Sequence, residues 1–155
     1  MQRPALLSVA TEIMNMALVN LTRDGHVAFA TLLIDKDGTI TPVLVQTRNS
    51  NERAAFGDVL RTLAPHLDAI VIVSEAWTLK PEDVDDVSLT MPVSHNPKRV
   101  EGVFVTAQSV CGELLLTKTF ERDSENKPIV EGEVTVTWTD APITTAGNFC
   151  KLFAT

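Results

Sequence analysis

Five consecutive apolar residues, Ala69 to Val73, constrain the fold of this 155-residue chain more than any other stretch. The run consists of alanine and β-branched side chains and leaves no polar face, which is typical of a strand that is buried on both sides. We therefore predict that it is the central strand of a sheet with a layer on each face. Ser74, Glu75 and Trp77 follow directly, where this strand should emerge from the core.

Two helices and a hairpin are predicted before the central strand. Apolar residues recur at three- and four-residue steps over residues 4–24, and their face is wider than a surface helix needs. The β-rich runs 26–34 and 39–47 predict a hairpin, and its second strand should lie at a sheet edge because Pro42 cannot donate a ladder hydrogen bond. A second helix is expected from about residue 51 to residue 64, capped by one of the polar residues Asn49, Ser50 and Asn51.

A long loop and three strands are predicted after the central strand. The loop, residues 78–98, contains three prolines and an acidic run at residues 82–86 that we interpret as solvated. Strands are expected at 100–110, 113–120 and 129–138, and the apolar side chains of Phe149, Leu152 and Phe153 should dock on the domain or on a second subunit. The fold class is therefore a single α/β (α+β) domain over residues 1–155. Its sheet should be mixed and six-stranded, with helices packed on it, in the order helix, two strands, helix, strand, long loop, three strands.

Composition and charge exclude several classes of function. The formal net charge is −7, and an acidic surface repels phosphate backbones, so general nucleic-acid binding is not expected. The sequence shows no secretory signal and no apolar run of membrane-spanning length, so we expect a cytoplasmic protein without a membrane segment. Cys111 and Cys150 are far apart and belong to no metal-binding motif, which predicts free thiols, no metal and no cofactor.

The predicted element order resembles that of zinc-dependent nucleoside deaminases and of Jab1/MPN metalloproteases, which are layered α/β/α proteins. That layering is compatible with the chain, but the zinc ligands of both families are missing. The second helix begins Asn51-Glu52-Arg53, without the His-x-Glu or Cys-x-Glu that a deaminase needs, and no Pro-Cys-x-x-Cys follows. His26, His66 and His95 are isolated, so the paired histidines of a Jab1-type site are absent as well.

A second resemblance covers residues 69–107. The segment Val73-Ser74-Glu75-Ala76-Trp77, a proline-bearing loop and Ser94-His95-Asn96-Pro97-Lys98-Arg99-Val100-Glu101 are similar to a pattern in small hypothetical proteins of bacteria and phages. In that pattern a Ser-Glu-Ala-Trp strand end precedes Pro-Ser-x-x-Pro-x-Arg-x-Glu, and Val93 here replaces the first proline. The resemblance implies a bacterial or phage setting and a fold, and no activity.

Six residues at this strand end form the candidate site, and they have two interpretations. In the structural one, Arg99 pairs with Glu75 or Glu101 beneath Trp77 and anchors the loop. In the functional one, Ser74, Glu75, Trp77, His95, Arg99 and Glu101 line a pocket for a ligand or partner.

Two functions follow from these interpretations. The leading hypothesis is a non-enzymatic binding or accessory protein, with a second copy of the chain or another protein as partner. The alternative is a small metal-independent hydrolase that uses Glu75, His95 and Arg99.

Overall fold

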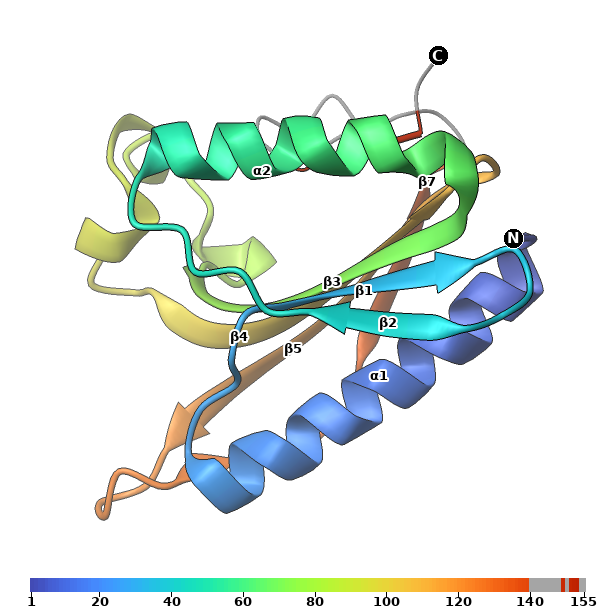
Figure 1. The fold of residues 1–155 in the computed structure, drawn as a ribbon. Coiled ribbons are helices and arrows are strands. Elements are labelled where there is room, and N and C mark those ends of the chain that lie inside the picture. Colours follow the sequence, from blue (N-terminus) through green and yellow to red (C-terminus); the bar gives the residue numbers. More distant parts are fainter. Residues whose placement is uncertain (140–148, 150, 154–155) are drawn as a thin grey trace.

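A computed structural model describes residues 1–139, 149 and 151–153, and Figure 1 shows its architecture. Two helices and seven strands are present in the described part of the chain. In chain order they are α1 (Arg3–Asp24), β1 (Ala30–Asp35), β2 (Ile40–Val43), α2 (Ser50–Leu63), β3 (Leu67–Thr78), β4 (Val100–Ser109), β5 (Gly112–Arg122), β6 (Pro128–Ile129) and β7 (Thr135–Thr139).

The sheet has the strand order β2-β1-β3-β4-β5-β6, with β7 also pairing with β5. This confirms the α+β class, but the predicted mixed six-stranded sheet is wrong in two respects. Every pairing among the described strands is antiparallel. The loop between β3 and β4 joins two neighbouring strands, whereas α2 connects β2 to β3, which are separated in the sheet by β1. The strand expected at 129–138 is divided into β6 and β7, and Gly132, with φ of 83°, lies in the gap between them.

One helix covers each face of the sheet, and the central strand β3 lies between two cores (Figure 1). Val71 and Val73 point to the α1 side, whereas Ile70 and Ile72 point to the α2 side, as the alternation of a strand requires. All four side chains are buried. The predicted central strand is therefore confirmed, and each of these side chains contributes about 1.5–3 kcal/mol through burial.

The ends of both helices follow from local sequence. Gly25, at φ of 80°, donates its N–H to the Leu21 carbonyl and ends α1. The Asn49 side chain accepts the N–H of Glu52 at 2.9 Å, which confirms the predicted cap of α2. Only Phe56, Gly57 and Leu60 are buried on α2, whereas its apolar residues Val59 and Leu63 are exposed.

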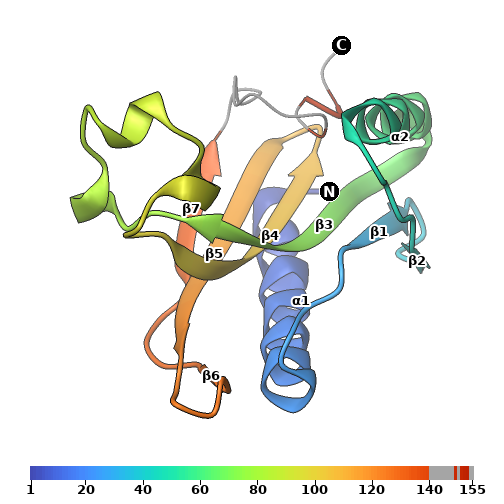
Figure 2. The same cartoon turned by 90° about the vertical axis from the view of Figure 1, so that its left-hand side faces the viewer.

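The segment from residue 79 to residue 99 projects from the sheet beyond both helices (Figure 2). It contains three short 3-10 turns and is organised by its own bonds. The Ser88 N–H donates to the Asp85 carboxylate at 2.7 Å, and the buried Asn96 side chain accepts the Lys98 N–H at 2.9 Å. The loop therefore forms a small lobe, which the sequence did not predict.

The described C-terminal residues pack on the α2 face, as expected. Leu152 is buried in the α2 core, and Phe149 and Phe153 pack against that core. Gln108 of β4 holds this segment, because its side chain donates to the Phe149 carbonyl at 2.6 Å and accepts the Leu152 N–H at 2.9 Å.

Candidate functional site

The structure brings three of the six candidate residues together on one face of the sheet. Trp77 and Glu101 are direct cross-strand partners in β3 and β4, and Glu75 lies opposite Val103, two pairs further along. All three side chains share the α1 face, because they continue the alternation of Val71 and Val73. Ser74 belongs to the opposite face, so it cannot work with Glu75 on a common substrate.

Arg122 of β5 is the cation that pairs with both carboxylates. Its guanidinium binds Glu101 through two contacts, Nε to Oε2 at 2.7 Å and one terminal nitrogen to Oε1 at 3.1 Å. Glu75 lies at 3.8 Å from the same guanidinium, within ion-pair distance. The three side chains are only 20–23% exposed. We call Glu75, Glu101 and Arg122 the carboxylate–arginine cluster.

This cluster also fixes the end of α1. Arg122 donates to the Gly25 carbonyl at 2.9 Å, and Glu75 accepts the Val27 N–H at 3.4 Å. A guanidinium at a helix C-terminus is favourable because the helix dipole is negative there. The hydrogen bond from Arg122 to Glu101 raises the pKa of Arg122, and the negative charges of Glu101 and Glu75 raise it further. Burial lowers this pKa, but by less than the hydrogen bond raises it. The cluster therefore joins α1, β3, β4 and β5.

The predicted pairing of Arg99 with Glu75 or Glu101 is wrong. Arg99 is exposed, its guanidinium stacks on the Trp77 ring at 4.7 Å from the ring centre, and it donates to the Asn96 carbonyl at 3.2 Å. Arg122 occupies the position expected for Arg99, because it is the next same-face residue after Phe120, the β5 partner of Glu101. The sequence signal that places Arg122 on this face is the alternation along β5 of Leu114, Leu116, Lys118, Phe120 and Arg122. This signal points to Glu101 only when the pairing register of β5 with β4 is known.

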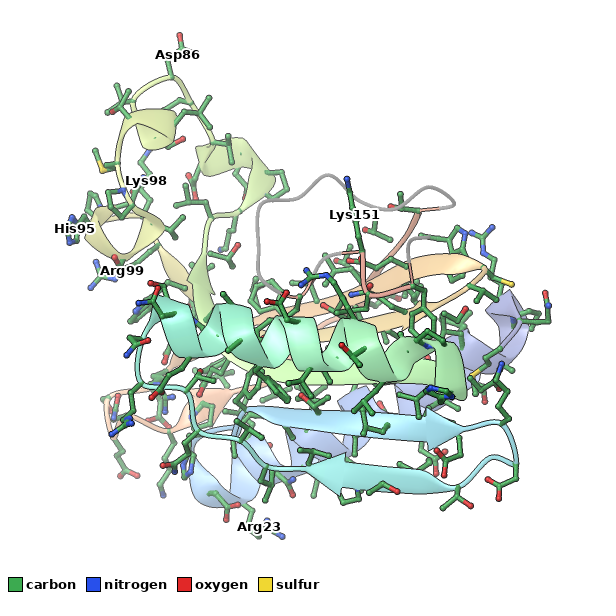
Figure 3. The ribbon with its side chains drawn as sticks, turned by 45° about the horizontal axis from the view of Figure 1, so that its top comes forward. Arg23, Asp86, His95, Lys98, Arg99 and Lys151 are labelled. Atoms are coloured by element: carbon green, nitrogen blue, oxygen red, sulfur yellow. The ribbon has the colours of Figure 1, made fainter. Side chains whose placement is uncertain are left out.

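His95 does not complete a catalytic group with these residues. It is exposed on the projecting lobe, near Lys98 and Arg99, and points outward (Figure 3). Among the described residues its ring makes no hydrogen bond or ion pair. The arrangement therefore offers no base–nucleophile pair, and both carboxylates already face a cation.

The described residues also contain no group of three or more His, Cys, Asp or Glu side chains placed to hold a metal ion. Cys111 is a free thiol that donates to the Gln2 side-chain oxygen at 3.4 Å. Cys150 lies outside the described residues, so the prediction that both thiols are free stays open for it.

An apolar groove of about 460 Å³ lies beside the cluster, and sequence reasoning missed it. We call it the α1–β2 groove. Val27 and Val73 form its end near Glu75, Val9, Ile13 and Met16 of α1 form one wall, and Ile40 and Leu44 form the other. Glu12 is the one charged side chain among its lining residues.

Helix α1 is apolar on more sides than the sheet can cover. Leu6, Ala10, Met14, Ala17 and Leu21 are buried, but Met16 and Val19 on its outer side are 62% and 64% exposed. By length and composition α1 is also the one described helix that could cross a membrane, a test that the core helix of a soluble protein passes as well. Met16 also lines the α1–β2 groove, whereas Val19 lies in a separate hollow beside Val130.

Comparisons with protein-family models, with curated proteins and with solved structures found no match for this chain.

Proposed function

We propose that this protein is a non-enzymatic binding protein, and that the α1–β2 groove is its interaction surface. The observation that carries the proposal is the uncovered side of α1. A helix that is apolar on most sides is normally enclosed, and exposed apolar surface of this kind marks interaction sites. In keeping with the sequence resemblance, we propose an accessory role in the bacterial cytoplasm, for a protein of a bacterium or of its phage.

We propose a second copy of the chain as the occupant of the groove. A two-fold interface must be self-complementary, so it needs protruding side chains beside a cavity that receives them. Met16, Ile40 and Leu44 protrude at the rims of the groove, with exposures of 62%, 48% and 76%. The near absence of charge in the lining also matters, because two copies that each carry −7 repel least where the contact surface is neutral.

Strand addition at β2 is a less favourable way to pair two copies. The Asp35 N–H donates to the Thr39 carbonyl, so these two residues form a hydrogen-bonded pair of the β1–β2 ladder. Hydrogen-bonded and non-hydrogen-bonded pairs alternate along an antiparallel ladder, so the pair Leu32–Pro42 is non-hydrogen-bonded and the nitrogen of Pro42 faces away from β1. A neighbouring strand would therefore lack a donor in the middle of the four-residue edge. Side-chain packing of α1 and β2 is the mode of association that this edge permits.

A membrane surface is a weaker occupant than a second copy. Helices that lie on anionic bilayers carry several Lys and Arg residues, whereas α1 has Arg3 and Arg23 at its ends. The net charge of −7 opposes contact with such a bilayer as well.

The alternative function, a hydrolase that uses Glu75, His95 and Arg99, has less support. Glu75 lies at ion-pair distance from Arg122, Arg99 is stacked on Trp77, and His95 is exposed on the projecting lobe, where it points outward (Figure 3).

Sedimentation equilibrium over a wide range of protein concentrations tests the proposal. We expect wild type to dimerise and Leu44→Glu to raise the dissociation constant by about tenfold or more, since burying one carboxylate costs more than the ~1.4 kcal/mol that tenfold requires. Leu89→Glu is the matched control, because Leu89 is also 76% exposed but lies on the projecting lobe.

A wild type that stays monomeric at every concentration would contradict the second-copy proposal, as would equal effects of Leu44→Glu and Leu89→Glu. Binding of the monomer to neutral or anionic vesicles, lost in Leu44→Glu, would assign the groove to a membrane instead.

A further inference from the structure

Lys118 of β5 is a buried lysine at a position where the sheet otherwise has apolar side chains. Leu114, Leu116 and Phe120 precede and follow it on the same face, and Lys118 is 6% exposed. Its direct partner in β4 is Val103, a core residue. A buried ammonium is costly unless its charge and its donors are satisfied.

The described residues satisfy Lys118 only in part. Its Nζ donates to the main-chain carbonyl of Glu131, and the described ion pairs that involve lysines are made by Lys80, Lys98 and Lys127 instead. An ammonium has three donors, so two donors and the full positive charge of Lys118 lack a described partner.

A cavity of about 380 Å³ lies at this place, between β5 and the chain around β6. Lys118 and Glu131 line it together with Lys80, which is 3.9 Å from Glu121 and therefore beyond hydrogen-bond distance of that carboxylate. Phe120 and Ile129 add apolar wall. The volume falls in the range of small-molecule pockets, which combine apolar walls with a few polar groups. By strand order this edge of the sheet is opposite to β2, so the pocket is separate from the α1–β2 groove.

We propose that this cavity, the Lys118 pocket, binds a small organic monocarboxylate. The carboxylate would accept from Lys118 and Lys80, and a short apolar tail would lie against Phe120 and Ile129. A single negative charge fits better than a phosphate, because Glu121 and Glu131 also line the cavity and repel a dianion more strongly. The ligand would supply the acceptors and the counter-charge that the described residues do not.

Titration of the full chain with butyrate, followed by amide NMR shifts, tests this proposal. We expect saturable shifts that include the Gly132 amide, since Lys118 Nζ lies 3.4 Å from the position that a Cβ of Gly132 would occupy. Butyramide, which has the same shape without the charge, should bind at least about tenfold more weakly, because hydrogen bonds to charged groups are the stronger ones.

Two variants locate the site. Lys118→Met puts an unbranched apolar side chain, one heavy atom shorter, into the same buried surroundings, and it should weaken butyrate binding by about tenfold or more. Lys80→Met alters a side chain that is 42% exposed, so it should fold and should also weaken binding. Lys127→Met is the control, because Lys127 is 73% exposed and does not line the cavity.

The proposal is overturned by an absence of saturable butyrate shifts in wild type, by equal affinity for butyramide, or by tighter binding of inorganic phosphate. It is equally overturned if Lys80→Met binds butyrate as wild type does. The oligomeric state has no bearing on these outcomes, so failure here and failure of the α1–β2 groove are distinguishable.

Discussion

Replacement of Arg122 by methionine should destabilise the fold far more than the same change at Arg99. Arg122→Met removes the two contacts to Glu101 at 2.7 and 3.1 Å, the charge beside Glu75, and the bond to the Gly25 carbonyl. It leaves two carboxylates that are 22% and 23% exposed without a cation.

The magnitude follows from this burial. Breaking a fully buried pair costs about 3–5 kcal/mol, and breaking an exposed one about 0–1 kcal/mol. With about a fifth of each group exposed, we expect a loss of about 2–4 kcal/mol in the free energy of unfolding. Arg99→Met removes an exposed cation–π contact to Trp77, which is 46% exposed, so we expect a loss of about 0.5–1 kcal/mol.

Urea unfolding followed by far-ultraviolet circular dichroism measures both losses without relying on the fluorescence of Trp77. Arg122→Lys should recover part of the loss, because an ammonium cannot reproduce the planar two-contact geometry. Glu101→Gln in the Arg122→Met background should recover another part, because it removes one stranded charge. Equal midpoints for Arg122→Met and Arg99→Met would refute the assignment of the cluster.

Three further predictions test the fold. Val71→Asp should abolish soluble expression, because an unpaired buried carboxylate costs several kcal/mol out of a typical total of about 5–15; a soluble variant with a normal melting temperature would contradict the placement of β3. Asn49→Ala should lower the free energy of unfolding by about 1 kcal/mol through loss of the α2 cap, and an unchanged urea midpoint would count against that role. Burial raises the pKa of Glu113 above its ordinary value, so the folded state holds this proton more tightly and stability falls as pH rises through the raised pKa. Glu113→Gln should therefore raise the melting temperature at about pH 7 and change it little at about pH 3, and a gain of equal size at both pH values would contradict this.

Local sequence signals predicted the parts of the fold that depend on near neighbours. The apolar run at Ala69–Val73, the edge position of Pro42 and the cap at Asn49 each carry their reason within a few residues. The number of strands was not predicted correctly, since the break at Gly132 looks like an ordinary strand glycine until its positive φ is known.

The candidate site was predicted only in part, because strand alternation is a local signal and the pairing of distant strands is not. Glu75, Trp77 and Glu101 do share a face, and strand alternation alone would have placed Ser74 on the other one. The choice between Arg99 and Arg122 depends on how β5 pairs with β4, which the sequence does not reveal. The α1–β2 groove was missed because the broad apolar face of α1 was assigned wholly to the core.

The pairing of Thr78 with Val100 means that the lobe of residues 79–99 begins and ends at adjacent points of the ladder. It is therefore a closed loop in the sense of polymer statistics, and its closure entropy changes slowly with length, by about 0.6 kcal/mol for each doubling. Insertions or deletions within this segment change the conformational entropy lost on closing the loop, and they leave the pairing of β3 with β4 unchanged. The length of the segment between Lys80 and Arg99 is thus free to change in evolution or in engineering while the strand ends beneath it keep their register.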